Sequence, residues 1–246
     1  MFLRPFLLAL QFLTRIPAPV WFEPRPEEWG WSVFYFPIVG LAIGLLLVAL
    51  NAVLSGADPG VAAALLLAVW ALTTGGLHLD GLADAADAWI GGFGDREKTL
   101  DIMRDPRSGP IAVMVMTLTL IAKFAALQAL LTQGAVVAAL WLSPVLGRSA
   151  IVLMLITTPY VRPQGVGVAH ALYLPRRAGI ILLLVVFAVT LAVLREGAVV
   201  LAVLLGLGFL GLRRLLRARL GGTTGDTLGA TCELAETVTL LALALT

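Results

Sequence analysis

The stretch "GIILLLVVFAVTLAVLREGAVVLAVLLGLGFLGL", residues 179–212, decides the fold class of this chain. Its side chains are almost all apolar, and the only charges stand in the short break "REG" at 195–197. A helix needs about 20 apolar residues to cross the hydrocarbon core of a bilayer. The run therefore predicts a tight hairpin of two short membrane helices, each roughly 15–16 residues long.

The composition of the whole chain supports a membrane location. Hydrophobic residues make up 60% of the 246 residues, charged residues make up 13%, and the mean hydropathy is +0.98. Soluble domains have about 45–50% apolar and about 25% charged residues. The net charge of +2 is too small to indicate nucleic-acid binding, and a single cysteine, Cys232, excludes an internal disulfide and a cysteine-based metal site.

Further apolar stretches have the length of membrane helices. They are residues 33–54, 61–77, 110–131, 135–158 and 226–246. With the hairpin they give about seven transmembrane helices. Residues 2–13 predict a short, retained, membrane-associated helix, because Pro17 and Pro19 make a poor signal-peptide cleavage site. The expected fold is an all-α, polytopic helical bundle, a single transmembrane catalytic domain over residues 1–246.

The basic residues predict the orientation of this bundle. With the N-terminus inside, residues 1–32, 78–109, 159–178 and 213–225 face the cytoplasm and hold 14 of the 17 lysines and arginines. The opposite loops hold only Arg195. Positive loops stay on the cytoplasmic side, so we expect a multi-pass protein of the cytoplasmic (inner) membrane whose active site faces the cytoplasm. The basic run "RRLLRAR", residues 213–219, is expected to attract anionic headgroups.

An acidic stretch, "GGLHLDGLADAADAW" at residues 75–89, stands out in this apolar chain. Asp80, Asp84 and Asp87 have the spacing i, i+4, i+7, which puts them on one face of a helix. Three carboxylates at a membrane boundary repel each other unless a cation offsets their charge. Mg²⁺ suits such oxygen ligands and usually binds substrate phosphates as well. We therefore expect these three aspartates to bind Mg²⁺, with Mn²⁺ as the alternative that suits the same oxygen ligands.

The following segment, "GGFGDREKTLDIMRDPRSG" at 91–109, adds basic residues beside the acids. Arg104 and Arg107 are candidates for binding phosphate oxygens, because arginine matches them with a two-pronged fork. Phosphoryl transfer depends mainly on positioning and on charge stabilisation. Residues 75–109 are therefore the predicted cytoplasmic active-site loop. Glu233 and Glu236 lie inside the last apolar stretch, with Arg148 as their expected counter-charge.

Several motifs together resemble the cobalamin synthase (adenosylcobinamide-GDP ribazoletransferase) family. They are "RIPAP" (15–19), "FPIVGLAIG" (36–44), "GGLHLDGLADAADAW" (75–89), "REKTLDIMRDPRSG" (96–109), "GRSA" (147–150) and "GDTLGATCELAE" (225–236). The segment "DPRSGPIAVM" departs from the family's usual "DSRIGTFG", although Asp105, Arg107 and Gly109 are retained.

The resemblance implies a Mg²⁺-dependent enzyme of vitamin B12 assembly. It would join adenosylcobinamide-GDP to α-ribazole or its 5′-phosphate and release GMP. Asp80, Asp84 and Asp87 would bind the metal, and Arg104, Arg107 and Arg148 would stabilise charge on the diphosphate. Asp105, Asp226 and Glu233 are three alternatives for completing the metal shell or accepting the hydroxyl proton.

Two other functions remain open from the sequence. A membrane phosphotransferase of the CDP-alcohol type also uses acids on helices and a metal, but Ala85 and Ala86 stand where its Ala-Arg pair is expected. An ion-coupled transporter would use the intramembrane acids as an ion path, although such proteins often carry internal repeats and this chain shows none. The oligomeric state is left open.

Overall fold

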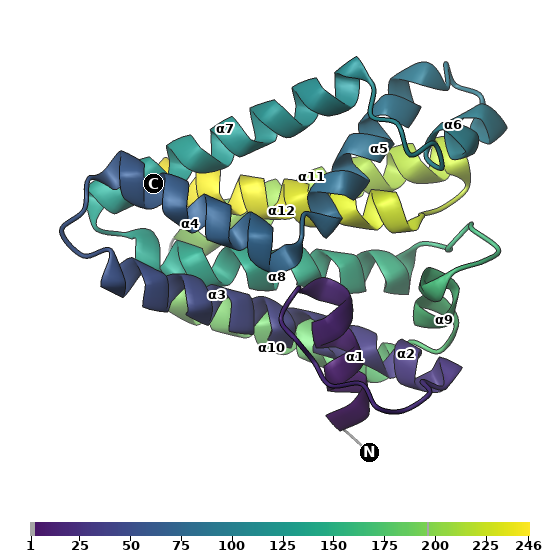
Figure 1. Cartoon of the computed structure of the whole chain (residues 1–246), viewed down its shortest axis with the longest axis horizontal. Helices are drawn as coiled ribbons and strands as arrows, with labels where there is room; N and C mark the ends of the chain where they lie inside the picture. The colour runs from purple at the N-terminus through teal and green to yellow at the C-terminus, as the bar shows by residue number, and fades with distance from the viewer. Residues whose placement is uncertain (1–2, 196) are drawn as a thin grey trace.

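The computed structural model describes residues 3–195 and 197–246. Within these residues the chain forms twelve α-helices and one 3-10 turn, and it has no β-strand. The only strand-like feature in the described part is an isolated bridge between Tyr160 and Thr223. The predicted all-α fold is confirmed (Figure 1).

Six helical segments are long and apolar enough to cross a membrane. They are Pro26–Val53 (α2 Pro26–Ser32, η1 Val33–Tyr35 and α3 Phe36–Val53), α7 Pro110–Gln133, α8 Val136–Thr157, α10 Arg176–Leu194, α11 Gly197–Leu220 and α12 Gly225–Ala244. A seventh span is counted if the bent pair α4 Pro59–Thr74 and α5 Leu77–Gly91 is one span. The predicted number of about seven is confirmed.

Three shorter helices complete the chain. They are α1 Leu3–Leu13, α6 Arg96–Ile102 and α9 Val166–Leu172. The apolar helix α1 corresponds to the predicted N-terminal segment 2–13, of which residue 2 lies outside the described residues. It lies against α2 and α3 at the polar end of the bundle (Figure 1).

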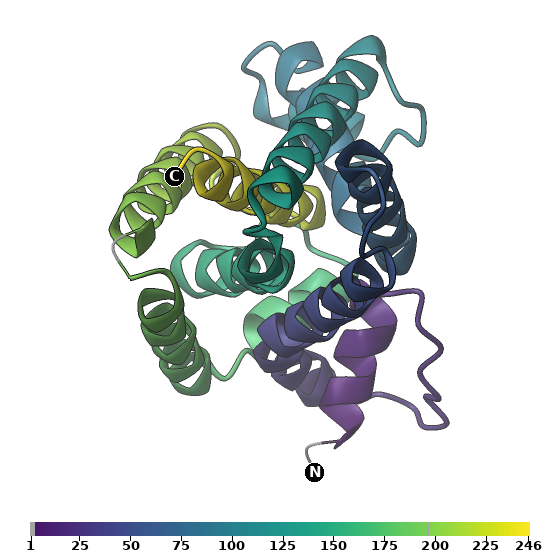
Figure 2. The same ribbon diagram turned by 90° about the vertical axis from the view of Figure 1, so that its left-hand side faces the viewer.

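Helices α3, α8 and α12 form the centre of the bundle, and α10 and α11 lie at one side (Figure 2). Gly40 and Gly44 allow α3 to approach α8 closely, because a side-chain carbon at either glycine would come within 3.0 Å of α8. In a bilayer, close packing replaces the hydrophobic effect as the force between helices. Small residues therefore hold the centre of this bundle together.

The structure differs from the sequence prediction at two places. The predicted hairpin is present, but α11 continues beyond residue 212 to Leu220, since Leu216 and Leu220 are buried. Residue 196, inside the predicted break, lies outside the described residues. The predicted span 61–77 ends earlier, at Thr74, and the chain turns by 85° into α5. Gly75 and Gly76 have φ values of +62° and +71°, the left-handed conformation that glycine adopts freely.

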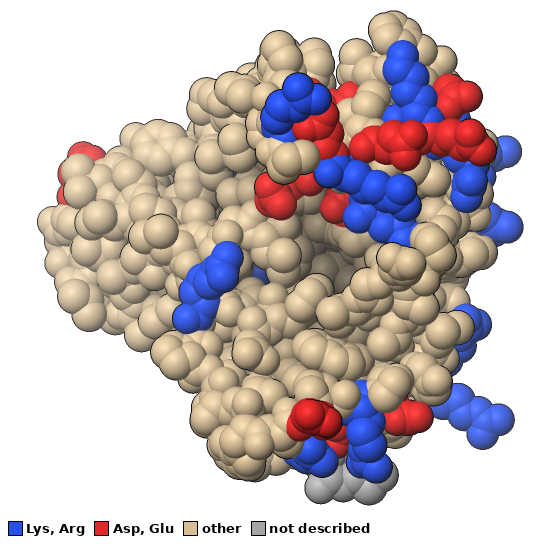
Figure 3. All heavy atoms as spheres, turned by 45° about the vertical axis from the view of Figure 1, so that its right-hand side comes forward, with Lys and Arg blue, Asp and Glu red and all other residues tan. Residues whose placement is uncertain are grey.

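The polar segments gather at one end of the bundle. Helices α5, α6 and α9 lie at this end, whereas short turns join the long helices at the other (Figure 1). A space-filling view shows most of its charged side chains at the same end (Figure 3). The chain is thus a multi-pass helical bundle with one polar end and one nearly apolar end.

Candidate active site

The acidic stretch forms helix α5, as its spacing predicts. Leu79, Leu82 and Ala83 are buried on the inner side of this helix. Asp80 is exposed on the other side and Asp84 is half-buried. Neither carboxylate has an ion-pair partner among the described residues. Alternation of small apolar and acidic residues therefore produces a helix that is fixed to the bundle and presents free carboxylates.

A close crossing of α5 and α12 brings a third acid to this place. A side-chain carbon at Gly81 would lie 2.9 Å from the carbonyl oxygen of Asp226 and 3.3 Å from Cα of Gly229. As a result, Asp226 lies close enough to Asp84 for their carboxylates to repel each other, as do Asp80 and Asp84. The polar end of the bundle therefore holds three acids from two helices, Asp80, Asp84 and Asp226.

One arginine joins this acidic group, and sequence reasoning missed it. Nη2 of Arg162 donates a hydrogen bond to Oδ2 of Asp226 at 2.5 Å and lies 3.4 Å from the carbonyl oxygen of Met103. Its Nε is buried and has no hydrogen-bond partner in the described residues. The signal was weak, because Arg162 stands alone in the loop segment "TPYVRPQG", 158–165, with no acid near it in sequence.

Asp87, predicted as a metal ligand, has a structural contact. Its Oδ2 accepts a hydrogen bond from the backbone N–H of Gly109 at 2.5 Å, and its Oδ1 accepts one from Ala112 at 2.9 Å. Both donors belong to the N-terminus of α7, where four N–H groups lack partners within the helix. The carboxylate therefore caps α7 and ties it to α5, a role that the helical spacing alone could not reveal.

The loop between α6 and α7 carries the predicted pair Arg104 and Arg107. Arg107 makes a two-pronged ion pair with Asp105, at 2.8 and 2.6 Å, and Arg104 lies 3.8 Å from Asp101. The Arg107 guanidinium holds the pKa of Asp105 at about 2, below its ordinary value. The loop leads from Met103, which contacts Arg162, to Gly109, which contacts Asp87. It therefore borders the acidic group, and its arginines pair with acids of their own segment.

Glu233 and Glu236 lie in a different place, inside the bundle. Nζ of Lys123 on α7 is 2.5 Å from a carboxylate oxygen of each glutamate. Arg148 on α8 pairs with Glu236, and its Nη2 lies 3.4 Å from Nδ1 of His78. The predicted counter-charge, Arg148, is confirmed for Glu236. Lys123 was missed, although a lysine inside an apolar span needs such a partner.

The candidate metal ligands do not form a cage of protein atoms. Within residues 3–195 and 197–246, no group of three His, Cys, Asp or Glu side chains is arranged to hold a metal ion. The predicted set of Asp80, Asp84 and Asp87 is therefore not a preformed three-carboxylate site, since Asp87 is engaged with α7. The donor chemistry of Asp80 and Asp84 still suits Mg²⁺, which usually takes one or two carboxylates, several waters and substrate phosphates.

The surface at this end is hollowed. Figure 3 shows a depression near the middle of the view, with acidic and basic side chains along its upper edge, on the side where α5 and α6 lie. Acidic side chains, which suit a cation, and basic side chains, which suit an anion, thus lie beside an open space (Figure 3). This combination suits a phosphorylated substrate.

Comparison with known proteins identifies the family. The family described as cobalamin-5-phosphate synthase matches residues 5–244. The chain belongs to this family. A relative from Pseudomonas fluorescens is 54% identical over 98% of this chain and 99% of its own, and one from Pseudomonas aeruginosa is 53% identical over 99% and 98%. Both are named adenosylcobinamide-GDP ribazoletransferase. No solved structure matches the chain.

Membership of the cobalamin-5-phosphate synthase family confirms the resemblance seen in the sequence motifs. It also supports a transferase function in cobalamin biosynthesis. The relatives match along the whole length, so the acidic helix α5, the loop to α7 and the start of α12 all lie within the matched range.

Proposed function

We propose that this chain is a Mg²⁺-dependent transferase that joins adenosylcobinamide-GDP to α-ribazole or its 5′-phosphate and releases GMP. The names of the relatives support the substrates, because the match covers nearly the full length of both chains. The bias of lysine and arginine towards one end supports an active site on the cytoplasmic side of the inner membrane.

One observation carries the proposed chemistry: Asp80, Asp84 and Asp226 gather at the polar end, where Arg162 is the one cation that acts on Asp84 and pairs with Asp226 among the described residues. Acids at a membrane boundary are costly unless a counter-charge is present. A divalent cation bound with a diphosphate would supply that charge. More acidic than basic side chains are thus expected at a site that binds a metal together with its substrate.

Asp80 and Asp84 are the residues that would hold Mg²⁺. Their carboxylate oxygens are free of ion pairs within the described residues, and they are hard ligands of the kind that the ion prefers. When bound, Mg²⁺ neutralises negative charge that develops on the diphosphate. Arg162 would complement it, because a guanidinium binds phosphate oxygens by two hydrogen bonds.

The transfer itself exchanges one phosphorus–oxygen bond for another. A ribose hydroxyl of α-ribazole forms a bond to the phosphorus that carries cobinamide, and the bond from this phosphorus to the oxygen of GMP breaks. The hydroxyl proton must pass to a base. Of the three candidates, we assign Asp226. It lies beside Asp84, and its ion-pair partner, Arg162, belongs to the same group, whereas Glu233 is held by buried Lys123 inside the bundle and Asp105 pairs with exposed Arg107.

A GMP-release assay tests this proposal. The purified protein, reconstituted in lipid nanodiscs, is given adenosylcobinamide-GDP, α-ribazole and Mg²⁺. We expect equal amounts of GMP and corrinoid product, and loss of both when a chelator removes the metal. Asp101→Asn, an exposed acid of α6, serves as the matched control for Asp84→Asn and is expected to retain activity.

Two outcomes would contradict the proposal. Full activity of Asp84→Asn across a Mg²⁺ titration would overturn the metal assignment. Absence of any product from protein that is folded and monodisperse would overturn the substrate assignment. Product formed from a CDP-alcohol would support the alternative phosphotransferase. Ion flux across the membrane without any product would support the transporter.

A further inference from the structure

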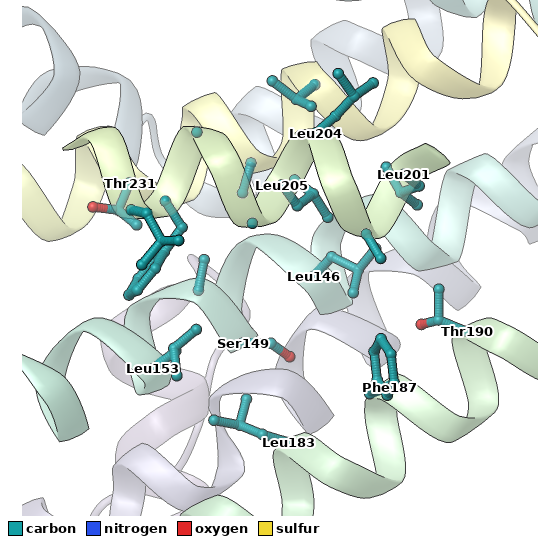
Figure 4. A pocket seen from close by; sticks show the side chains of 18 of the residues that line it. Leu146, Ser149, Leu153, Leu183, Phe187, Thr190, Leu201, Leu204, Leu205 and Thr231 are labelled. Atoms are coloured by element: carbon teal, nitrogen blue, oxygen red, sulfur yellow. The ribbon is translucent and has the colours of Figure 1, made fainter. Parts of the chain in front are cut away.

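A large apolar cavity lies between α8, α10, α11 and α12, away from the acidic group. Its volume is about 830 Å³. Figure 4 shows side chains of several helices around it, among them Leu146, Leu183, Phe187 and Leu205. Its few polar side chains include hydroxyls of Ser149 and Thr190, each of which donates to a backbone carbonyl of its own helix. The walls therefore offer almost nothing that water could bind.

The helices that border the cavity on its outer side are the least buried spans. Only 11% of the most apolar 18-residue stretch of α10, and of α11, is buried. The corresponding share is 67% in α8 and 72% in α12. Atoms that line an empty space lose their dispersion contacts. An apolar chain in the cavity would restore these contacts and join the hairpin to the bundle.

The end of the cavity nearest the polar loops is strongly basic. Arg176 and Arg177 begin α10, and the end of α11 carries Arg213, Arg214, Arg217 and Arg219. In the sequence between residues 163 and 225 the only acidic residue is Glu196. This end of the hairpin thus carries six arginines with no acid of its own segment to neutralise them.

Arg213 connects the basic end to the cavity, because it is one of the lining residues. Its Nε and Nη2 donate hydrogen bonds to the carbonyl oxygen of Thr157 at 3.2 and 2.8 Å. These two bonds hold the guanidinium at the end of α8. Its Nη1 makes no hydrogen bond or ion pair within residues 3–195 and 197–246, so it is available to a phosphate oxygen.

We propose that this cavity is a binding site for an anionic phospholipid. One acyl chain lies between α8, α10, α11 and α12, and the headgroup phosphate contacts Arg213, with Arg214 and Arg217 beside it. From Ala198 to Arg213 the lining of α11 extends over about 22 Å, at 1.5 Å per residue. This length lies within the roughly 30 Å thickness of the hydrocarbon core, so an acyl chain can enter the cavity from the polar end.

The bound lipid would support the helix that carries part of the candidate active site. Thr231, Leu234 and Val238 of α12 line the cavity, whereas Glu233 and Glu236 on another face of the same helix bind Lys123 and Arg148. The acyl chain would thus complete the packing of α12 on the side opposite its ion pairs.

Lipid retention tests the proposal without any measurement of activity. The protein is exchanged into nanodiscs of phosphatidylcholine and phosphatidylglycerol in equal amounts, re-extracted in mild detergent, and its retained lipids are quantified by mass spectrometry. We expect phosphatidylglycerol to be retained in preference to phosphatidylcholine. Arg213→Gln should lower this preference about fivefold, since one arginine near the surface contributes roughly that much to anionic-lipid binding.

Matched variants separate the cavity from the rest of the surface. Gly208→Phe places a ring in the cavity, and Gly211→Phe places one elsewhere on α11; neither glycine has an atom near the position of a new side-chain carbon. We expect lipid retention to fall in the first variant and to stay at the wild-type level in the second. Arg195→Gln, at the opposite end of the hairpin, should also behave as wild type, and Arg213→Lys should retain the lipid.

Several results would overturn the proposal. Equal retention of both lipids by the wild type would exclude a preference for the anionic headgroup. Wild-type retention by Gly208→Phe would exclude the cavity. A dimer that Gly208→Phe converts to a monomer, with retained lipid unchanged, would show that a second copy of the chain covers this face. Only variants with the wild-type elution profile are compared, and Arg213→Lys supplies the charge comparison if Arg213→Gln does not fold.

Discussion

Two groups of charged side chains in this protein differ in how far their charges are paired. Inside the bundle, Lys123 and Arg148 are matched by Glu233 and Glu236, and all four side chains are buried. At the polar end, Asp80, Asp84 and Asp226 lie together, and in the described part of the chain one cation, Arg162, acts on Asp84 and pairs with Asp226.

The difference separates structure from function. A buried charge without a partner is strongly destabilising, so the interior group must be complete. The terminal group is partly exposed and incomplete, which leaves it able to bind a cation and a phosphate. A group in which every charge is paired therefore indicates a role in holding helices together. A group with unpaired acids indicates a role in binding.

The largest effect is expected from breaking the interior group. Glu236→Ala removes the carboxylate shared by Lys123 and Arg148 and should lower the free energy of unfolding by about 3–5 kcal/mol. Thermal melting in mild detergent measures the change. Glu97→Ala, an exposed acid at the start of α6, is the control, and an equal effect of both changes would refute the distinction between the two groups.

The terminal group should respond in the opposite way. Asp84→Asn is expected to lower GMP release about 10²–10³-fold, because a group that positions charge at the reacting phosphate is lost. Its melting temperature should match or exceed that of the wild type, since repulsion from Asp80 and Asp226 is relieved. A variant that melts early and stays active per folded molecule would contradict this prediction.

The crossing of α5 and α12 links the two groups. A substitution there should have an intermediate effect on both stability and GMP release. Gly81→Ala places a methyl group 2.9 Å from the carbonyl oxygen of Asp226 and should cost about 1–3 kcal/mol of stability through overpacking. The rate of GMP release should fall further than the folded fraction, because Asp84 and Asp226 move apart. Gly211→Ala, with open space at the new carbon, is the control and should preserve both quantities.

The smallest effect is expected in the loop that borders the terminal group. In Asp105→Asn the exposed pair with Arg107 is lost, and exposed pairs contribute little to stability. The low pKa of Asp105, about 2, means that any stabilisation by its charge is present above the ordinary value of 3.8 and is lost only as the pH falls through about 2. Melting temperatures between pH 5 and 8 should therefore follow the wild type.

The same variant also tests the role predicted for Asp105 from residue type. GMP release is expected to change less than about fivefold, in line with an exposed ion pair. A loss as large as that of Asp84→Asn would show instead that Asp105 accepts the proton or binds the metal.

The sequence predicted those features that depend on local order along the chain. Apolar runs predicted the spans, and the spacing of Asp80, Asp84 and Asp87 predicted a helix with an acidic face. The motifs from residue 15 to 236 indicated the family, which the comparison confirmed. Each of these signals can be read within a single segment, because hydrophobic length and helical period are local properties.

Apart from the pairing of Arg148 with Glu236, features that depend on contacts between distant segments were not predicted. The capping of α7 by Asp87 requires residues 22 and 25 positions apart to meet. The pairing of Arg162 with Asp226 joins segments 64 positions apart, and that of Lys123 with Glu233 joins segments 110 apart. A single sequence lists the charges of such pairs but holds no signal that tells which ones become neighbours.

The 85° bend between α4 and α5 has a consequence for the depth of the site in the bilayer. A helix that crosses the membrane presents successive turns at different depths, 5.4 Å apart. Because α5 runs nearly at a right angle to α4, its turns lie almost level with one another along the axis of α4. Asp80 and Asp84, one turn apart on α5, are therefore nearly level along the direction of α4, and under the proposed function a diphosphate that lies across this direction meets both at once.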